Sequence, residues 1–313
     1  MKCLIVDDMH SSFMTMLKEL GMEADYCPDI NREEILRRIE DYEGLVIRSK
    51  TVVDKELIDA GKRLDFIGRA GAGLDNLNIN HLNERGIKVF NAGEGNCDAV
   101  GDHTVGMVLS LLKNISKSNM EVRAGQWIRE GNRGRELSSM VVGIIGYGNT
   151  GKAVAKRLSA FGCKVLVYDK YKKGFGGGGV KEMSLSEILN NADIITLHLP
   201  LTDETRNLVN KGFIGTVRKE FYLINTSRGE IVDTKGLIEG LNSGKIKGAA
   251  LDVFEKEGRA FIDSMSEGPV SELLKNKNII FTPHIAGWSV ESYERISKTL
   301  FDKIKACFFN NCK

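Results

Sequence analysis

The sequence predicts an α/β protein of two domains, in which a doubly wound parallel sheet is inserted into a second parallel-sheet domain. Short β-branched runs alternate with helical stretches from end to end, a pattern typical of parallel sheets covered by helices. The 313 residues exceed the size of one ordinary core. A helical stretch over 290–308 follows the last strand without a sheet of its own, so we expect it to pack on the first domain. The predicted domains are therefore 1–97 plus 287–313 and 98–286.

The first domain is predicted to hold five strands with helices between them. The strands are expected at residues 2–6, 23–26, 45–48, 66–69 and 88–90. The stretch 32–39 is predicted to be helical, with Asn31 as its N-cap, because an asparagine side chain can accept a hydrogen bond from the first helical turn. We expect a flavodoxin-like fold for this domain.

The second domain is predicted to open with a long helix over about 98–119 and to continue with six strands. The strands are expected at residues 141–145, 165–168, 194–198, 222–225, 249–253 and 278–281. Six strands with crossover helices match the Rossmann-type doubly wound fold. The glycine-rich patch 174–179 is most simply interpreted as a mobile loop.

Composition excludes several classes of protein. Hydrophobic residues at 42% and charged residues at 27% describe a soluble globular chain rather than a disordered or fibrous one. A net charge of +2 is too small to indicate binding to nucleic acid or to an anionic membrane, and no apolar run reaches the roughly 18 residues of a membrane helix. The acidic end of the first segment argues against a signal peptide. Six scattered cysteines indicate reduced thiols in the cytoplasm rather than disulfides or a metal site.

A glycine-rich turn predicts a dinucleotide site. The turn Gly146-x-Gly148-x-x-Gly151 follows the strand 141–145 and opens a helix over 149–161. Gly146 permits a tight turn, Gly148 lets the backbone approach a pyrophosphate, and Gly151 allows the helix to pack closely on the strand. The phosphates would then meet the free N–H groups at the helix N-terminus.

Asp169 is predicted to select the cofactor. It ends a strand and lies 18 residues beyond Gly151, close to the spacing of about 20 expected for the acid that binds the ribose hydroxyls. A carboxylate there accepts hydrogen bonds from the hydroxyls and repels a 2′-phosphate, so NAD is favoured over NADP. The lysines of residues 170–173 are the opposing signal, since cations there could tolerate NADP.

His284 is the predicted general acid/base, because an imidazole with an ordinary pKa of about 6.5 gives and takes protons near neutrality. It follows the last strand and enters a turn of small residues, the usual place for a functional group in an α/β sheet. Arg228 also follows a strand, and its guanidinium can bind a carboxylate through two parallel hydrogen bonds. Glu257 would orient the imidazole and raise its pKa, although alone it could equally be a solvated acid.

Asp252 and the four remaining histidines are assigned to the cofactor pocket or are weaker candidates for a functional role. Asp252 ends a strand and could bind the nicotinamide carboxamide, and His198 is expected to line the cofactor pocket. His103, on the predicted long helix, is a weaker candidate. His10 and His81 are interpreted as surface or cap residues.

Five motifs together resemble the D-isomer-specific 2-hydroxyacid dehydrogenases. They are the glycine turn, His198-Leu-Pro-Leu-Thr-Asp-Glu-Thr205, Asn225-Thr-Ser-Arg-Gly229, Leu251-Asp-Val-Phe-x-x-Glu257 and Thr282-Pro-His-Ile-Ala-Gly287. The resemblance implies that Arg228 binds the substrate carboxylate and carbonyl, that Glu257 supports the base, and that His284 transfers the proton. It also implies NAD contacts at Asn149, Thr150, Asp169, Leu199, Pro200, Thr205, Thr226, Arg228, Asp252 and His284. Family members are usually homodimers joined through their nucleotide domains.

Two motifs look most like those of 3-phosphoglycerate dehydrogenases, the entry to serine synthesis. They are Val46-Ile-Arg-Ser49 and Arg69-Ala-Gly-Ala-Gly-Leu-Asp-Asn76. The resemblance implies 3-phospho-D-glycerate as substrate, and the basic side chains of these segments suit its phosphate. The expected substrate contacts are Arg48, Ser49, Arg69, Ala72, Gly73, Asn96 and Arg228. Because the sequence stops soon after the last predicted helix, we expect no C-terminal regulatory domain that binds serine.

Departures from the family pattern leave rival functions open. Gly258 stands where the family commonly has proline, and residues 91–96, expected to form a loop beside the substrate, lack their usual proline. A hydroxypyruvate or glyoxylate reductase is the nearest rival, since it would use the same machinery. A rival of another class is an NAD-sensing interaction protein resembling a corepressor, which the intact Arg228, Glu257 and His284 set disfavours.

Overall fold

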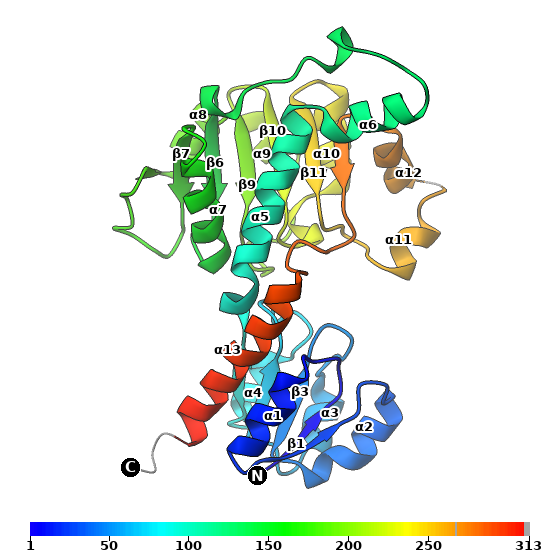
Figure 1. Ribbon diagram of the computed structural model, residues 1–313, viewed down its shortest axis with the longest axis vertical. Helices are drawn as coiled ribbons and strands as arrows, with labels where there is room; N and C mark the ends of the chain where they lie inside the picture. The colour runs from blue at the N-terminus through cyan, green and yellow to red at the C-terminus, as the bar shows by residue number, and fades with distance from the viewer. Residues whose placement is uncertain (267, 310–313) are drawn as a thin grey trace. The chain divides into compact units, whose positions relative to one another are not determined.

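The computed structural model describes residues 1–266 and 268–309, and these form two compact units. The first unit joins Met1–Cys97 to the segment that begins at Trp288, and the second is Asp98–Gly287. Each unit contains one parallel sheet with helices on both faces, which confirms the predicted α/β class (Figure 1). Residues 310–313, on which the predictions for Cys312 and for the end of the chain depend, lie outside the described part.

The first unit contains a five-stranded sheet. Its strands are β1 (Lys2–Ile5), β2 (Glu23–Tyr26), β3 (Gly44–Ile47), β4 (Phe66–Arg69) and β5 (Lys88–Asn91). All neighbours pair in parallel in the order β2-β1-β3-β4-β5, which is the flavodoxin-like order. In this order the loops that follow β1 and β3 lie side by side at the carboxyl edge of the sheet.

Helices cover both faces of this sheet. They are α1 (Ser12–Glu19), α2 (Arg32–Arg38), α3 (Lys55–Ala60), α4 (Ile79–Glu84) and α13 (Val290–Phe308), with a 3-10 turn η1 (Ile39–Asp41). The helices α2, α3 and α4 share one core cluster, and α1 and α13 share the other. Ile296, Leu300 and Ile304 recur every four residues on α13 and are buried, so this helix presents one apolar face to the sheet. The predicted cap is confirmed: Asn31 accepts a hydrogen bond from the N–H of Glu34.

The second unit contains a seven-stranded parallel sheet. Its strands are β6 (Val141–Ile145), β7 (Lys164–Tyr168), β8 (Val180–Glu182), β9 (Ile194–Leu197), β10 (Phe221–Asn225), β11 (Ile246–Leu251) and β12 (Ile279–Phe281). The order β12-β11-β10-β9-β6-β7-β8 is that of a Rossmann-type sheet with one further strand, β12, at its edge. The strand order reverses between β6 and β9, and such sheets bind their ligands at the carboxyl ends beside this point.

The helices of the second unit also form two layers. They are α5 (Gly93–Leu112, mostly in this unit), α6 (Ile115–Arg123), α7 (Asn149–Ser159), α8 (Leu185–Asn191), α9 (Lys211–Thr216), α10 (Thr234–Asn242), α11 (Arg259–Asp263) and α12 (Gly268–Lys275), with 3-10 turns η2 (Glu130–Asn132), η3 (Leu137–Ser139) and η4 (Gly229–Ile231). The helices α5 and α7 pack on one face, where Val108 and Val154 are buried. The helices α8, α9, α10 and α12 pack on the other. Figure 1 shows α5 and α7 lying across one face of this sheet.

Two predictions about local structure were wrong, and one short strand was missed. The helix expected over 98–119 is two helices, α5 and α6, because Asn114 adopts a left-handed conformation (φ 53°) that ends the first and starts the second. The glycine-rich patch 174–179 is a loop, as predicted, but it leads into β8, which was missed because this strand is too short to give an apolar run. Residues 91–96 are not a loop, since α5 begins at Gly93. Among the described residues, no helix has the length and apolar character needed to cross a membrane.

Candidate active site

Functional side chains of the second unit gather at the carboxyl ends of five neighbouring strands. The order β12-β11-β10-β9-β6 brings these ends together at one edge of the sheet. The predicted residues follow the strands one by one: Gly146 after β6, His198 after β9, Arg228 after β10, Asp252 after β11 and His284 after β12. Topology alone therefore places residues far apart in the sequence at a single edge.

The glycine turn after β6 has the geometry of a phosphate cradle. Gly146 has φ 99°, and a Cβ on it would lie 2.2 Å from the carbonyl oxygen of His198. A Cβ on Gly151 would lie 2.0 Å from the carbonyl oxygen of Gly146, so the start of α7 packs directly on the turn. At Gly148 the added Cβ would meet nothing within 4 Å, and no side chain caps α7 there. The first turn of α7, with Asn149 and Thr150, therefore suits an anion such as a pyrophosphate.

Asp169 follows β7 beside this turn. Its carboxylate accepts hydrogen bonds from the backbone N–H groups of Tyr147, Tyr171 and Lys172, at 2.7, 2.9 and 2.9 Å. Burial alone would raise the pKa of Asp169, but these three donors and the charge of Lys172 lower it overall. The ionised carboxylate retains acceptor capacity, which suits the ribose hydroxyls of a dinucleotide.

The lysines that could have favoured NADP have partners within this unit. The ammonium of Lys170 lies 2.7 Å from the carboxylate of Glu204. Lys172 donates to the carbonyl oxygen of Tyr147 at 3.1 Å. Lys173 lies over the ring of Tyr168, 5.9 Å from its centroid. Each of the three ammonium groups thus has a contact within this unit, and that of Lys170 is with an acid.

His198 is a buried, neutral imidazole at the end of β9. Its Nε2 lies 2.9 Å from the hydroxyl of Thr196, and burial lowers the pKa of His198 to about 3. Its Nδ1 is buried and has no hydrogen-bond partner among the described residues. Nearby, the hydroxyl of Thr226 lies 3.0 Å from that of Thr104 on α5. A neutral imidazole with one free nitrogen fits a side chain that lines a ligand pocket.

Hydrogen bonds also fix the loop after β9. The hydroxyl of Ser227 donates to the carbonyl oxygen of Leu197 and accepts from the N–H of Leu199, so the ends of β9 and β10 are joined. Thr205 closes the loop by donating to the carbonyl oxygen of Pro200 at 2.7 Å. These contacts give Leu199, Pro200 and Thr205 defined positions beside the glycine turn.

His284 and Glu257 form the central pair of the site. The Nδ1 of His284 lies 2.7 Å from Oε2 of Glu257. Burial alone would raise the pKa of Glu257, but the hydrogen bond and charge of His284, the N–H of Phe254 and the charge of Arg228 lower it overall. An ionised carboxylate only accepts hydrogen bonds, so Nδ1 carries the proton and neutral His284 has its lone pair at Nε2. His284 is thus oriented to accept a proton at Nε2.

Arg228 is held beside this pair by the turn that follows β10. The side-chain amide of Asn225 donates to the carbonyl oxygen of Arg228 at 2.9 Å, and Arg228 donates to the carbonyl oxygen of Ser227 at 2.7 Å. The next residue must be glycine, because a Cβ on Gly229 would lie 1.8 Å from the carbonyl carbon of Phe254. This close packing brings the Arg228 turn onto the segment that carries Glu257.

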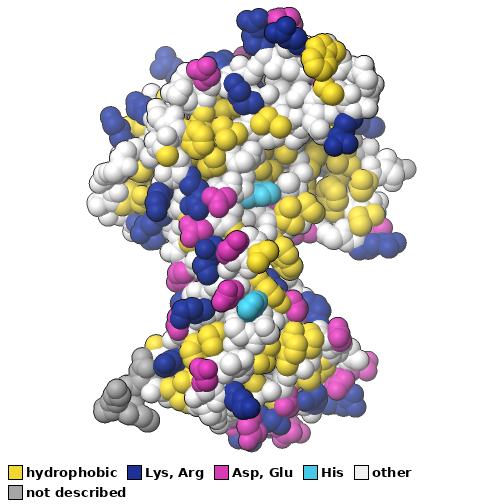
Figure 2. Space-filling view, in the orientation of Figure 1, with side chains coloured by type: hydrophobic (Ala, Val, Ile, Leu, Met, Phe, Trp, Pro, Cys, Tyr) yellow, Lys and Arg dark blue, Asp and Glu magenta, His cyan; other side chains and the backbone are white. Residues whose placement is uncertain are grey.

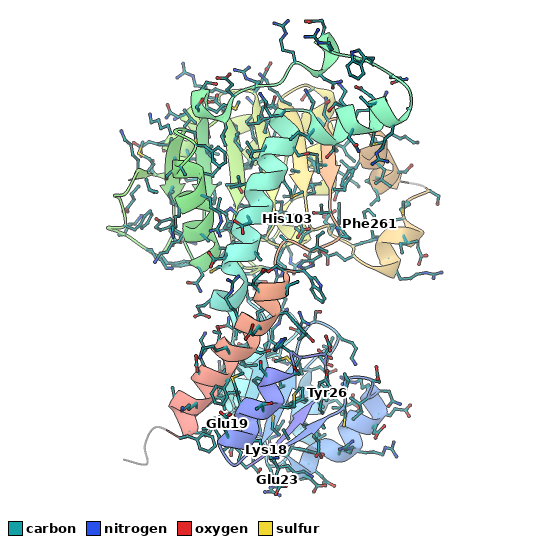
Figure 3. All side chains as sticks on the ribbon, in the orientation of Figure 1. Lys18, Glu19, Glu23, Tyr26, His103 and Phe261 are labelled. Carbon is teal, nitrogen blue, oxygen red and sulfur yellow. The ribbon has the colours of Figure 1, made fainter. Side chains whose placement is uncertain are left out.

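The segment after Glu257 has its own backbone requirement. Gly258 adopts φ 59°, and a Cβ there would meet nothing within 4 Å, so backbone conformation rather than crowding favours glycine. Beyond it, Phe261 on α11 stacks on Phe254 with ring centroids 4.5 Å apart. Figure 3 labels Phe261 on this short helix. The stacking anchors α11 next to the segment that holds Glu257.

Asp252 and Thr282 have contacts that the sequence analysis did not foresee. The buried carboxylate of Asp252 accepts hydrogen bonds from the hydroxyl of Thr282 and from the backbone N–H groups of Ile285 and Ala286. His103, set aside from sequence, lies with its Nε2 3.0 Å from the hydroxyl of Thr282. Thr282 was not singled out at all, and its place two residues before His284 is the one signal that points to it.

In the first unit, Arg48 lies against aromatic rings and beside an acid. Its guanidinium stacks over the rings of Trp288 and Tyr293, at 4.6 and 5.2 Å from their centroids, and its side chain is only 13% exposed. It also lies 3.9 Å from the carboxylate of Asp8. Hydrogen bonds from Tyr293 and Tyr26, the second labelled in Figure 3, outweigh burial and lower the pKa of Asp8. An ionised acid therefore opposes the charge of Arg48.

The other predicted substrate residues of this unit lie on the loops after β3 and β4 or on α5. Ser49 is exposed and adjoins Arg48, while Ala72 and Gly73 follow Arg69 in the loop after β4. Asn96 lies on the first turns of α5. Among the described residues no group of His, Cys, Asp or Glu side chains is arranged to hold a metal ion.

Comparison with known proteins identifies the family. Residues 105–286 match the model of the D-isomer specific 2-hydroxyacid dehydrogenase, NAD binding domain, which is more than half of the chain. The chain belongs to this family. It is 36% identical over 306 residues, 97% of its length, to a D-3-phosphoglycerate dehydrogenase of Archaeoglobus fulgidus. It is 34% identical to a hydroxypyruvate reductase of Thermotoga maritima, covering 92% of this chain and 90% of that protein.

A solved structure supports the same fold. The D-lactate dehydrogenase of Aquifex aeolicus, crystallised with NAD and lactic acid, superposes with a TM-score of 0.83 at 29% identity, over 98% of this chain and 95% of its own. The chain spans 56% of the length of the Archaeoglobus phosphoglycerate dehydrogenase. Within the family, the glycine turn, Asp169 and the first turn of α7 are the residues of this chain that fit NAD.

Proposed function

We propose that this chain is an NAD-dependent dehydrogenase that oxidises 3-phospho-D-glycerate to 3-phosphohydroxypyruvate. The observation that carries the reaction type is the Glu257–His284 pair at 2.7 Å with Arg228 on the adjoining turn. When bound, NAD supplies the redox chemistry by accepting a hydride from the substrate. Everything else in the reaction is assigned to side chains of the chain itself.

His284 is proposed to take the hydroxyl proton. With its Nδ1 proton donated to Glu257, its Nε2 lone pair accepts the proton as the C–O single bond becomes a carbonyl. The carboxylate of Glu257 stabilises the resulting imidazolium. In the reverse direction the same nitrogen returns the proton to the carbonyl oxygen of a 2-keto acid.

Arg228 is proposed to bind the substrate carboxylate. A guanidinium offers two parallel N–H donors, which fix the orientation of a carboxylate better than an ammonium does. Arg228 lies near enough to Glu257 to lower the pKa of that acid, so a substrate carboxylate bound there would lie beside the base. This geometry suits acids with the hydroxyl on the adjacent carbon.

The phosphorylated substrate is proposed for two reasons. Relatives named D-3-phosphoglycerate dehydrogenase match nearly the whole chain, and one loop of the first unit carries cations. Lys50 and Arg48 stand two residues apart after β3. One observation favours a second candidate, a hydroxypyruvate or glyoxylate reductase: Asp8 already opposes Arg48, and Asp7 lies 3.7 Å from the ammonium of Lys50. Two acids against two cations would weaken binding of a dianionic phosphate.

Steady-state kinetics with NADH tests these alternatives. We expect kcat/KM for 3-phosphohydroxypyruvate to exceed that for hydroxypyruvate or glyoxylate by at least about tenfold, the effect of one charge-assisted hydrogen bond. A preference for hydroxypyruvate or glyoxylate would move the assignment to the reductase. Absence of turnover with all three would reject the proposal, provided that tryptophan fluorescence shows NADH binding.

We also propose that the second unit is the NAD-binding domain, that the first recognises the substrate, and that the protein is a homodimer. An arm from α6 to the loop before η2 carries large apolar side chains exposed to solvent, with Met120 69% and Trp127 81% exposed. Figure 2 shows apolar side chains on the surface of this region, among charged ones. Monomers rarely expose such groups together. Cys3, Cys27, Cys163 and Cys307 are free thiols, which supports a reducing compartment such as the cytoplasm.

A further inference from the structure

We propose that three side chains, His103, Thr282 and Asp252, form a positioning chain that holds His284 in the conformation required for proton transfer. This inference rests on the proposed role of His284 as the base. It gives Asp252 a positioning role in addition to the nicotinamide contact implied by family resemblance. It also gives functions to His103, which lies outside the five motifs, and to Thr282, which opens the motif of His284 without a role of its own so far.

The backbone of His284 needs external support. Its φ of 55° lies in the left-handed region, which residues other than glycine rarely adopt. Residues held in this region persist when the surrounding structure fixes them. The N–H of His284 donates to the carbonyl oxygens of Asp252 and Thr282, at 2.8 and 3.1 Å. The turn is therefore tied directly to the end of β11.

The carboxylate of Asp252 holds the other side of the same turn. Its Oδ1 accepts from the N–H of Ile285 and its Oδ2 from the N–H of Ala286, both at 2.9 Å. The side chain of Asp252 is 1% exposed. A buried acid that accepts from the two amides after His284 fixes the backbone from which the imidazole projects.

Thr282 and His103 complete the chain. The hydroxyl of Thr282 lies 2.5 Å from Oδ1 of Asp252 and, since a carboxylate only accepts, it donates its proton there. The hydroxyl oxygen of Thr282 also lies 3.0 Å from Nε2 of His103. Since the hydroxyl proton is already donated to Asp252, His103 donates to this oxygen. Figure 3 labels His103 on α5. The imidazole therefore anchors the turn to a long helix that packs on the sheet.

The test compares Thr282→Val, which removes the hydroxyl at nearly constant volume, with Thr282→Ser, which keeps it. We expect Thr282→Val to lower kcat about tenfold, the value of one lost hydrogen bond, and Thr282→Ser to restore most of it. The KM and Kd for NADH should stay within about twofold in both, because the glycine turn and Asp169 are untouched. His103→Leu should act in the same direction as Thr282→Val, and His103→Gln, which keeps a donor, should act less.

A matched control is Thr216→Val on α9. The Thr216 hydroxyl donates to the carbonyl oxygen of Phe213 in its own helix and lies outside the site. The control should keep wild-type kcat, and its melting temperature shows what the loss of a hydroxyl does to the fold. Equal loss of kcat in Thr282→Val and Thr282→Ser would overturn the proposal, as would a parallel loss of NADH affinity.

A spectroscopic measurement separates this inference from the proposed function. In the wild type, the Nδ1 proton of His284 that is bonded to Glu257 should give a low-field proton NMR signal, assigned by its loss in His284→Gln. We expect Thr282→Val to shift or broaden this signal and Thr282→Ser to retain it. If no 2-keto acid is turned over, the proposed function fails while the signal still decides the inference. An unchanged signal in Thr282→Val would overturn the positioning chain.

Discussion

The two units each place an arginine at the carboxyl end of a parallel strand, and the two arginines have different surroundings. Arg228 lies beside Glu257, whose carboxylate is already bonded to His284. Arg48 lies over the rings of Trp288 and Tyr293 and close to Asp8. The acid near Arg228 is bonded to a histidine that can become positively charged, whereas the acid near Arg48 is bonded to two neutral tyrosines.

This difference shows why position at a strand end is not enough to identify an anion site. The charge that a ligand meets is the sum over the cation and its neighbours, and partly buried neighbours are weakly screened. In the second unit, the carboxylate of Glu257 accepts the Nδ1 proton of His284, so it is not directed at Arg228 alone. In the first unit, Asp7 and Asp8 face Arg48 and Lys50. The comparison therefore predicts a strong carboxylate site and a weaker phosphate site.

The largest loss of activity is expected when the proposed base, His284, is replaced. His284→Asn should lower kcat by about 10²-fold or more, because it removes the general acid/base, while the Kd for NADH stays near the wild-type value. Stopped-flow and fluorescence titration would measure the two quantities. A kcat close to that of the wild type would show that another group carries the proton, and the contrast between the two arginine sites would lose its meaning.

The phosphate site should respond less strongly. Arg48→Ala is expected to raise KM for 3-phosphohydroxypyruvate more than about tenfold, the value of one charge-assisted hydrogen bond, and to leave turnover of an unphosphorylated keto acid nearly unchanged. Asp8→Asn should act in the opposite direction and lower that KM, because it removes the competing anion. Equal damage to both substrates in Arg48→Ala would mean that Arg48 binds the carboxylate common to them.

Cofactor choice should change by a smaller factor. Asp169→Ala removes both an acceptor for the ribose hydroxyls and a negative charge that repels a 2′-phosphate. The ratio of kcat/KM for NADH over NADPH should fall severalfold, by about the value of one hydrogen bond. Tyr171→Phe, which keeps the backbone donor to Asp169, serves as the control. An unchanged ratio in Asp169→Ala would show that the lysines after Asp169 decide the preference.

The smallest effect concerns stability and pH. Hydrogen bonds from Tyr293 and Tyr26 lower the pKa of Asp8 in the folded state, so its stabilising contribution is present above the usual Asp range near 3.9 and is lost as pH falls through the folded pKa. Asp8→Asn should therefore melt slightly below the wild type at pH 7, and the difference should vanish once the pH lies below the folded pKa of Asp8. Asp203→Asn, in the exposed loop after β9, is the control. A difference that persists in acid would refute the electrostatic explanation.

Strand ends explain how much of this molecule was predictable. β2 and β4 were placed at their observed bounds, and Arg228, Glu257 and His284 were selected because each lies in the segment that follows a strand with an apolar run. Position after a strand is a local property that sequence displays. The short strand β8 was missed because it has a single buried residue, Val180.

Contacts between distant residues were not predictable in the same way. The pairing of Asp8 with Arg48 and Tyr293 joins three segments far apart in the chain, and nothing local to Asp8 indicates it. The hydrogen bond from His103 to Thr282 has the same character, since it depends on where α5 packs. Both contacts bear on specificity or positioning rather than on the identity of the fold.

The left-handed Gly258 has a consequence for engineering. Substitution toward the residue most common in a family is a frequent route to higher stability, and at this position that residue is proline. Proline fixes φ near −65°, whereas Gly258 adopts 59°, so the ring could enter only if the chain after Glu257 were rebuilt. A proline at this position would displace Glu257, the acid proposed to support the base. A consensus design of this protein should therefore retain Gly258.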